Sequence, residues 1–480
     1  MKIAINKYNT LIESVILFGV CILYFQLINR ITFNYHPVWS DEFFYFINSS
    51  SFVQNNTLNA ALTFSGEGAM IFGADAHGFG YPLLHGIIAK ILGWSNLNFI
   101  ILNFILILIS ILIILILKGI SISQKLSISI FILLFPFIPI YAFTYMQEVI
   151  HVFISILLSA LIYIVYKKNN NSVYIILFIL TIIISGIFRS LWFFWLIGLI
   201  PLAKNKKQAI FYCLLFLFGI VLSFIFTKLF SDPIYNNYFS SVLYLLETGK
   251  IKNMIFSLTH HFFNNIFLYF FSIKNNVSIE VVTIYIFMKY ATISLVGFFI
   301  FIAFRKKSPL YIALSLIGTV NFLLLFLLYD AFEWREIRTM SPLFYFYSLF
   351  IVLETKGFSR YIQVGCLLII FSLTFKTSIQ GITERNTVNL QAINKEKIAY
   401  NEISEKVKNN AIIFMNYTPK DYSWDLLNLP LHNINNSQIK YIIQYVKQEK
   451  TKYDYTLMRP SKETLSNKII DNEYFILLKQ

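Results

Sequence analysis

Charged residues are scarce in this chain. Only 13% of its 480 residues are Asp, Glu, Lys or Arg, whereas 57% are hydrophobic and the mean hydropathy is +0.66. A water-soluble domain needs a far more polar surface, so the composition argues against one. The apolar runs of about 15 to 24 residues suit α-helices that cross a hydrocarbon core of about 30 Å, and they are too long for barrel strands. The sequence therefore predicts an all-α polytopic membrane protein.

Several sequence signatures are also missing, and each absence narrows the chemistry. No Walker loop, no GxGxxG run followed by an acidic residue and no GxSxG elbow occurs, so soluble nucleotide cofactors are not indicated. No HExxH or similar spacing predicts a metal site, although a divalent cation is left open as a cofactor. The three cysteines all fall inside apolar runs, which leaves exported loops no disulfide framework: Cys21, Cys213 and Cys366.

The positive charge of the chain lies between its apolar runs. Many of the Lys and Arg residues behind the formal net charge of +15 form short clusters there, where they set membrane orientation and do not indicate nucleic acid. We predict about eleven spans, near residues 11–31, 97–117, 126–143, 147–166, 173–188, 191–203, 209–230, 281–304, 309–329, 340–354 and 360–378.

One apolar stretch decides the orientation. The run YPLLHGIIAKILG is short for a span and contains His85 and Lys90, so we interpret it as an interfacial helix. With that choice the basic clusters all lie on the side of the N-terminal lysines, as the positive-inside rule requires. The N-terminus is then cytoplasmic, and the first span is retained as a signal anchor. The long loops of residues 32–96 and 231–280 become external.

The composition changes near residue 380. Residues 1–379 hold the predicted spans and form a transmembrane module, whereas residues 380–480 are charged and rich in Asn and Lys. This second segment contains strand-like runs, AIIFMNY and YFILL, with the helix-like run SQIKYIIQYVKQE between them. We predict a small exported C-terminal α/β domain.

An acidic pair, Asp41 and Glu42 in WSDEFFYF, follows the first span. It opens an aromatic amphipathic stretch that would hold both carboxylates at headgroup depth. A carboxylate near hydrocarbon is costly and commonly marks a functional site, which favours a catalytic role. The alternative is that Ser40 caps a helix whose dipole the two acids favour by about 0.3 to 1 kcal/mol.

Further polar residues lie on the same predicted side. Glu148 begins the fourth span in YMQEVIHVF, and His151 follows one turn later on the same helical face. In the first loop, His77 and Tyr81 of HGFGYPLLH are candidates for substrate binding. The alternative is that Glu148 is a solvated carboxylate at a helix start and His151 a core histidine.

Arginine residues supply candidates for binding an anion. DAFEWREIRTMSP lies between two spans and offers Arg335 and Arg338 on one helical face beside Trp334, and Arg189 occupies the tight turn of FRSLWFFW. Guanidinium groups suit a phosphate or pyrophosphate because their planar forks bind two oxygens at once. The alternative is an exposed loop paired with its own acids.

These features occur in a characteristic order: an acidic pair after the first span, the run HGFGYPLLHGIIAKILG, an acid opening the fourth span, and Arg residues followed by Pro in a late loop. In this order the chain resembles the GT-C glycosyltransferases. Within them it resembles the lipid-phosphate-sugar-dependent branch, which includes protein O-mannosyltransferases, aminoarabinose transferases and O-antigen serotype-converting glucosyltransferases. The resemblance covers roughly the first 350 residues. The chain departs from the pattern where GFGYPLL replaces a His-Pro-Pro-Leu run and where Glu148 replaces an Asp.

The resemblance implies transfer of a sugar from a polyprenyl-phosphate-linked donor, often undecaprenyl phosphate, on the external face of a bacterial inner membrane. The acceptor it favours is a lipopolysaccharide O-antigen or another surface glycan. It implies that Asp41 acts as general base on the acceptor hydroxyl, while Glu42 and Glu148 orient the acceptor or tune that base. The arginine side chains named above would stabilise the leaving lipid phosphate.

Three other functions stay open. A polysaccharide polymerase or ligase would place its key Arg and His residues in a large late loop, yet the loop of residues 231–280 contains no arginine. A protein O-glycosyltransferase differs only in its acceptor. A lipid-linked-sugar flippase or other transporter would show internal repeats and polar residues deep in its spans, and neither is evident in the sequence.

Overall fold

The chain folds into two compact units. A computed structural model describes residues 2–31, 40–55, 79–95, 97–168, 171–230, 237–272, 278–328, 338–408, 411–415, 440–443, 454–458, 467–471 and 475–479. The first unit comprises Met1–Arg30, Ile100–Thr227 and Asn236–Gly381, and the second comprises Ile31–Phe99, Lys228–Tyr235 and Ile382–Gln480.

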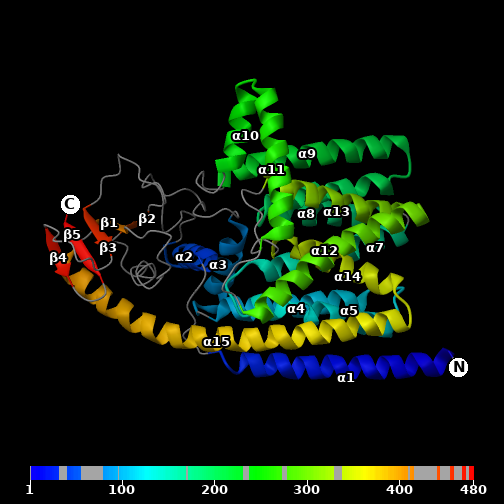
Figure 1. Ribbon diagram of the computed structural model, residues 1–480, viewed down its shortest axis with the longest axis horizontal. Helices are drawn as coiled ribbons and strands as arrows, with labels where there is room; N and C mark the ends of the chain where they lie inside the picture. The colour runs from blue at the N-terminus through cyan, green and yellow to red at the C-terminus, as the bar shows by residue number, and fades with distance from the viewer. Residues whose placement is uncertain are drawn as a thin grey trace. The chain divides into compact units, whose positions relative to one another are not determined.

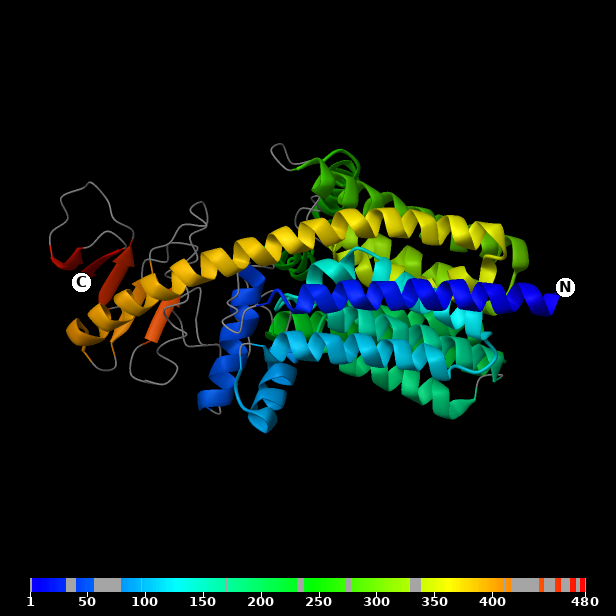
Figure 2. The ribbon, with the colours of Figure 1, turned by 90° about the horizontal axis from the view of Figure 1, so that it is seen from below.

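The first unit is a bundle in which most helices lie side by side (Figures 1 and 2). Its elements are α1 (Lys2–Ile28), α4 (Asn98–Ile116), α5 (Ile122–Leu134), α6 (Phe137–Tyr141), α7 (Glu148–Lys167), α8 (Ser172–Gly186), the 3₁₀ helix η1 (Ser190–Leu202), α9 (Lys206–Phe230), α10 (Asn237–Glu247), α11 (Ile251–Phe271), α12 (Ile279–Lys306), α13 (Pro309–Leu328), α14 (Ser341–Glu354) and the start of α15 (Phe358–Lys406). Helices α10 and α11 run across the others (Figure 1).

Each predicted span coincides with a helix of this bundle, which confirms the polytopic α-helical fold. Among the described residues, seven helices are long and apolar enough to cross a membrane: α1, α4, α7, α9, α12, α13 and α15. The other predicted spans correspond to shorter helices: α5, α8, η1 and α14. The span predicted over residues 126–143 is interrupted, because α5 ends before Pro136 and the five-residue α6 follows.

The core of the first unit lies between α7 and α14. In α14 every residue from Ser341 to Val352 is buried, and 78% of the apolar window of α7 is buried. The outer helices are different, since only 22% of the corresponding window is buried in α1 and 17% in α9. Their exposed side chains are mostly Leu, Ile, Val and Phe, as expected for a surface that faces lipid.

A buried ion pair ties α1 and α15 to α5 near the end of the bundle where α1 begins. Arg360 Nη2 lies 2.9 Å from Glu13 Oε1 and donates a hydrogen bond of 2.9 Å to Ser123 Oγ. Ser127 Oγ donates to the same carboxylate over 2.6 Å. Because both charges are buried, their mutual neutralisation allows α1 and α15 to lie side by side here.

The second unit contains α2 (Ser40–Asn55), α3 (Gly80–Leu92), the end of α15 and a five-stranded sheet in the order β2-β1-β3-β5-β4. Its strands are β1 (Ile412–Met415), β2 (Lys440–Ile443), β3 (Tyr455–Met458), β4 (Lys468–Asp471) and β5 (Ile476–Lys479). β1 pairs in parallel with β2 and β3, and β5 pairs antiparallel with β3 and β4. Helix α3 confirms the short helix expected over YPLLHGIIAKILG.

The strands predicted in AIIFMNY and YFILL are confirmed as β1 and β5, but the helix predicted over SQIKYIIQYVKQE is wrong for Lys440–Ile443. This segment, KYII, pairs with β1 as β2. A short apolar run cannot be assigned to helix or strand by periodicity alone, and β-branched and aromatic residues favour the strand once a partner is available. Helix α15 also passes residue 380 without a break and ends at Lys406.

Candidate functional site

The candidate site of the first unit lies at the end of the bundle where α7 and α14 begin, which we call the Glu148 end. Glu148 occupies the first turn of α7 and is only 3% exposed. The positive end of the helix dipole stabilises its carboxylate there. Arg338, three residues before α14, brings its Nη1 atom to 3.8 Å from Glu148 Oε1. The loops that precede α7 and α14 therefore meet, although nearly two hundred residues separate them in the sequence.

His151 lies one turn beyond Glu148 and is also buried. Its Nδ1 atom accepts a hydrogen bond of 3.0 Å from Trp192 Nε1. An indole nitrogen only donates, so Nδ1 carries no proton and the proton of a neutral His151 resides on Nε2. This bond fixes the tautomer of His151 and joins α7 to η1.

The 3₁₀ geometry of η1 explains why Arg189, Trp192 and Trp195 share one edge of the helix. With three residues per turn, positions i and i+3 eclipse each other. Arg189, which caps η1, is followed at this spacing by Trp192 and Trp195, whose ring centroids are 4.6 Å apart. The next position in the row is Gly198, where a Cβ atom would lie 2.5 Å from Ile317 Cδ1 of α13. The glycine thus allows the close approach of η1 and α13.

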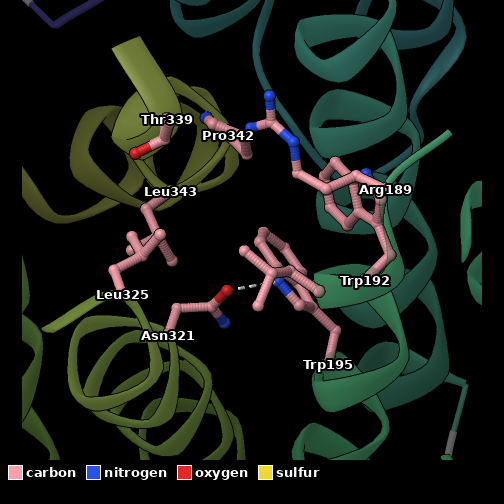
Figure 3. Close-up of a pocket in the computed structure, with 9 residues that line it drawn as sticks. Arg189, Trp192, Trp195, Asn321, Leu325, Thr339, Pro342 and Leu343 are labelled. Carbon is pink, nitrogen blue, oxygen red and sulfur yellow. Dashed lines mark hydrogen bonds between the residues drawn. The ribbon is translucent and has the colours of Figure 1, made fainter. Parts of the chain in front are cut away.

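A pocket opens along this edge, which we call the Arg189 pocket (Figure 3). Its empty space amounts to about 310 Å³ when the open solvent at its mouth is included, and its lining residues are Arg189, Leu191, Trp192, Trp195, Asn321, Leu325, Thr339, Pro342 and Leu343. The guanidinium lies at one end near Pro342, the two indoles form one wall, and Leu325 and Leu343 lie on the opposite side. At the far end Trp195 Nε1 donates to Asn321 Oδ1 over 3.0 Å. The pocket combines an anion-binding group with apolar walls.

Two polar residues at this end were missed by the sequence analysis. Gln147 is 1% exposed, and neither its amide oxygen nor its amide nitrogen has a hydrogen-bond partner within the part of the chain that the structure describes. The same holds for Ser341 Oγ, one turn after Arg338. A buried polar group without a partner costs about 1 to 3 kcal/mol, so such groups are typical of places where a ligand completes the hydrogen bonds. The only sequence signal was the adjacency of Gln147 to Glu148.

In the second unit, Asp41 and Glu42 occupy the first turn of α2, where the helix dipole favours both carboxylates. Asp41 is partly buried and Glu42 is fully buried. A carboxylate is costly to bury, so the favourable helix dipole at this position helps to offset the cost of burying Glu42. These acids and Glu148 belong to different units.

Tyr81 belongs to an aromatic cluster that supports α2 against α3. Its ring meets Tyr45, one turn after Glu42, with centroids 5.1 Å apart. His85 lies 4.3 Å from Tyr81 and stacks on Phe99 at 3.9 Å. Burial holds the pKa of His85 well below its usual value, so this imidazole is neutral. Tyr81 is therefore buried against α2, where it contacts Tyr45 one turn after Glu42.

Three candidates, His77, Trp334 and Arg335, lie outside the described residues. Among the residues that the structure does describe, no group of three or more His, Cys, Asp or Glu side chains lies close enough together to hold a metal ion.

Comparisons with known proteins give one kind of match. No protein-family model matches the chain, and no curated protein matches it by sequence. Among solved structures, an oligosaccharyltransferase of Archaeoglobus fulgidus with Zn and sulfate is similar over 88% of this chain and 62% of its own, with a TM-score of 0.51 and 11% identity. That enzyme is a GT-C membrane glycosyltransferase.

The protein has a GT-C-like fold. A second structure of the archaeal enzyme, AglB with an inhibitory peptide and a dolichol-phosphate, aligns over 90% of this chain and 64% of its own, with a TM-score of 0.50 and 10% identity. The chain thus spans less than two thirds of the length of these neighbours. At this identity the likeness shows the GT-C-like fold alone.

Proposed function

We propose that the protein is a membrane glycosyltransferase that moves a sugar from a polyprenyl-phosphate-linked donor to an acceptor at the Glu148 end. The observation that carries this proposal is the buried Glu148–Arg338 pair near the Arg189 pocket in a GT-C-like fold. Buried acids and guanidinium groups at one end of a membrane bundle mark a functional site because they are costly to keep there.

The donor would bind through its phosphate and its lipid. Arg189 and Arg338 would offer planar donors to the phosphate oxygens, and the apolar side chains around the mouth of the pocket would contact the start of the lipid. The dolichol-phosphate bound to the archaeal neighbour supports a donor of this class. The departing lipid phosphate is a stable anion that needs charge stabilisation more than a proton.

The acceptor hydroxyl would be activated by Asp41. As its proton passes to the carboxylate, the acceptor oxygen forms a bond to the anomeric carbon, and the bond from that carbon to the phosphate oxygen breaks. A positioned base contributes about 10²- to 10⁴-fold to such a step. Glu42 and Glu148 would orient the acceptor, with Gln147 and Ser341 as hydrogen-bonding groups for its hydroxyls or those of the sugar.

The acceptor is either a glycan or a protein. A surface glycan such as an O-antigen is our first choice, with the site on the external face of a bacterial inner membrane, the N-terminus cytoplasmic and the predicted C-terminal domain of residues 380–480 holding a bulky acceptor. The inhibitory peptide bound to the archaeal neighbour favours a protein acceptor as the second choice. A divalent cation stays open as a cofactor, and assays with and without added divalent cation test that requirement.

Sugar transfer by the purified protein in proteoliposomes tests the proposal. The donors are radiolabelled sugars on polyprenyl phosphate, and the variants are Arg189→Ala and Arg338→Ala, with Lys376→Ala as control because Lys376 forms an exposed ion pair with Glu280. We expect the arginine variants to lose about 10²- to 10³-fold in rate, as when one donor to a developing oxyanion is removed. Equal activity in all variants would show that Arg189 and Arg338 do not stabilise the leaving phosphate. If the protein moves solute across the vesicle membrane but transfers no sugar, it is a transporter and not a glycosyltransferase.

A further inference from the structure

The segment between α9 and α12, predicted as an external loop of residues 231–280, contains a helical hairpin. Helices α10 and α11 are joined through Gly249, whose φ of +68° only glycine adopts readily. Lys250 N donates to Leu245 O over 2.9 Å and Gly249 N to Leu246 O over 3.1 Å, the pattern of a Schellman motif. The reversal is therefore well defined, and α11 packs along α10.

Three hydrogen bonds hold α11 against the spans α12 and α13. Asn265 Nδ2 donates to Phe326 O over 3.0 Å, and Tyr269 Oη donates to Lys289 O over 2.7 Å. In return, Lys289 Nζ donates over 2.8 Å to Phe270 O, one of the last carbonyls of α11. A lysine is costly inside a span, and this contact satisfies it while complementing the negative end of the α11 dipole.

These contacts set the depth of α11. The ring of Tyr269 lies 5.5 Å from that of Phe326 and 6.4 Å from that of Phe322, which are two and six residues before the end of α13. At a rise of about 1.5 Å per residue, these positions lie roughly 3 and 9 Å below the end of the span. Figure 1 shows α11 running across α12 and α13 and not along them. Amphipathic helices that lie in the plane of a membrane sit about 5 to 10 Å deep.

The face of α11 opposite Asn265 and Tyr269 is apolar and exposed. Phe256, Phe263, Phe267 and Phe271 are 74%, 63%, 60% and 69% exposed, and their spacing of seven, four and four residues puts them on one helical face. We call these four residues the aromatic stripe. His260 lies within it, its ring next to that of Phe256.

We propose that α10 and α11 form an in-plane membrane anchor, with the aromatic stripe among the phospholipid acyl chains of the leaflet at the Glu148 end. The ring of Tyr269, on the opposite face of α11, packs beside residues below the end of the span α13, and α12 also exposes apolar side chains next to Lys289, namely Ile286 three residues before it and Tyr290 one residue after it. Lys250 and Lys252 are exposed at the turn and at the start of α11, where basic side chains reach lipid phosphates. This anchor does not depend on the chemistry of the Arg189 pocket.

Spin labelling of the full chain in liposomes tests the anchor. Cys21, Cys213 and Cys366 are first replaced by serine, and single cysteines are then introduced as Phe256→Cys, Phe263→Cys and Phe267→Cys. Leu217→Cys on the exposed face of α9 serves as the lipid reference and Glu405→Cys near the end of α15 as the water reference. Collision rates with oxygen and with a water-soluble nickel chelate are measured at each position.

Labels on the aromatic stripe should match the lipid reference, with frequent collisions with oxygen and rare collisions with nickel. Three positions are labelled so that one poorly folded variant does not decide the result, and monodisperse elution confirms the fold of each. Nickel collisions as frequent as at Glu405 would overturn the proposal in favour of a solvated loop. Rare collisions with both reagents would overturn it in favour of a protein partner, such as a second copy of the chain, covering the stripe.

Discussion

Replacing Arg338 by alanine removes the guanidinium that lies 3.8 Å from the buried carboxylate of Glu148. Removing one partner of a buried ion pair costs about 3 to 5 kcal/mol because the remaining charge stays in a medium of low polarity. The Arg338 side chain is 18% exposed and its contact is longer than a direct hydrogen bond. We therefore expect a loss of about 2 to 3 kcal/mol, at or just below the lower limit of that range.

A double-mutant cycle isolates this interaction. The free energies of unfolding of Arg338→Ala, Glu148→Gln and the double variant are measured by SDS titration in mixed micelles, followed by far-UV circular dichroism. Because Glu148→Gln removes the charge that Arg338 neutralises, the double variant should lose less than the sum of the single losses, with a coupling energy of about 1 to 2 kcal/mol.

The matched control is Lys376→Ala, which removes a cation from the exposed pair with Glu280 and should leave the free energy of unfolding almost unchanged, because water screens such a pair. If Arg338→Ala costs no more than this control, or if the two single losses simply add, the reasoning about a buried pair at the Glu148 end is refuted.

Three further variants probe the same end of the bundle, each by thermal unfolding in detergent. Trp192→Phe keeps the ring but removes the donor to His151 Nδ1, and it should cost about 0.5 to 1.5 kcal/mol; an unchanged melting temperature would argue against this hydrogen bond. Gln147→Leu removes a buried amide without a hydrogen-bond partner in the described structure, so stability should hold or rise by about 1 kcal/mol while sugar transfer falls; a loss of stability would mean that the amide is a structural group. Gly198→Ala puts a methyl group 2.5 Å from Ile317 Cδ1 and should cost about 1 to 3 kcal/mol, whereas a neutral effect would show that the Ile317 side chain moves aside.

Long apolar runs made the bundle predictable because a membrane span requires both length and uniform hydrophobicity. That criterion misses α11, whose run contains His260, His261 and Asn265 and which lies across the spans. Its position depends on contacts with α12 and α13 that local sequence does not encode. The same holds for β2, since KYII becomes a strand by pairing with β1.

The candidate site was predictable in part. Charge in an apolar context singled out Glu148, Arg189 and Arg338, and the structure brings Glu148 and Arg338 together. The alignment of Trp192 and Trp195 behind Arg189 could not be predicted, because it follows from the three-residue period of a 3₁₀ helix. Helix η1 has thirteen residues, and 3₁₀ helices of this length are uncommon. Gln147 and Ser341 stand out only through burial, which is a property of the tertiary structure.

The roles of Asp41 and Glu42 stay proposals, and the measurement that tests them most directly is sugar transfer from a polyprenyl-phosphate donor by wild type, Asp41→Asn and Glu42→Gln in proteoliposomes. The proposed mechanism, with Asp41 as general base, predicts sugar transfer by wild type and a loss of about 10²- to 10⁴-fold in rate in Asp41→Asn, at unchanged stability and donor binding. Full activity in Asp41→Asn would contradict it, as would a wild type that binds the lipid donor but transfers no sugar to glycan or peptide.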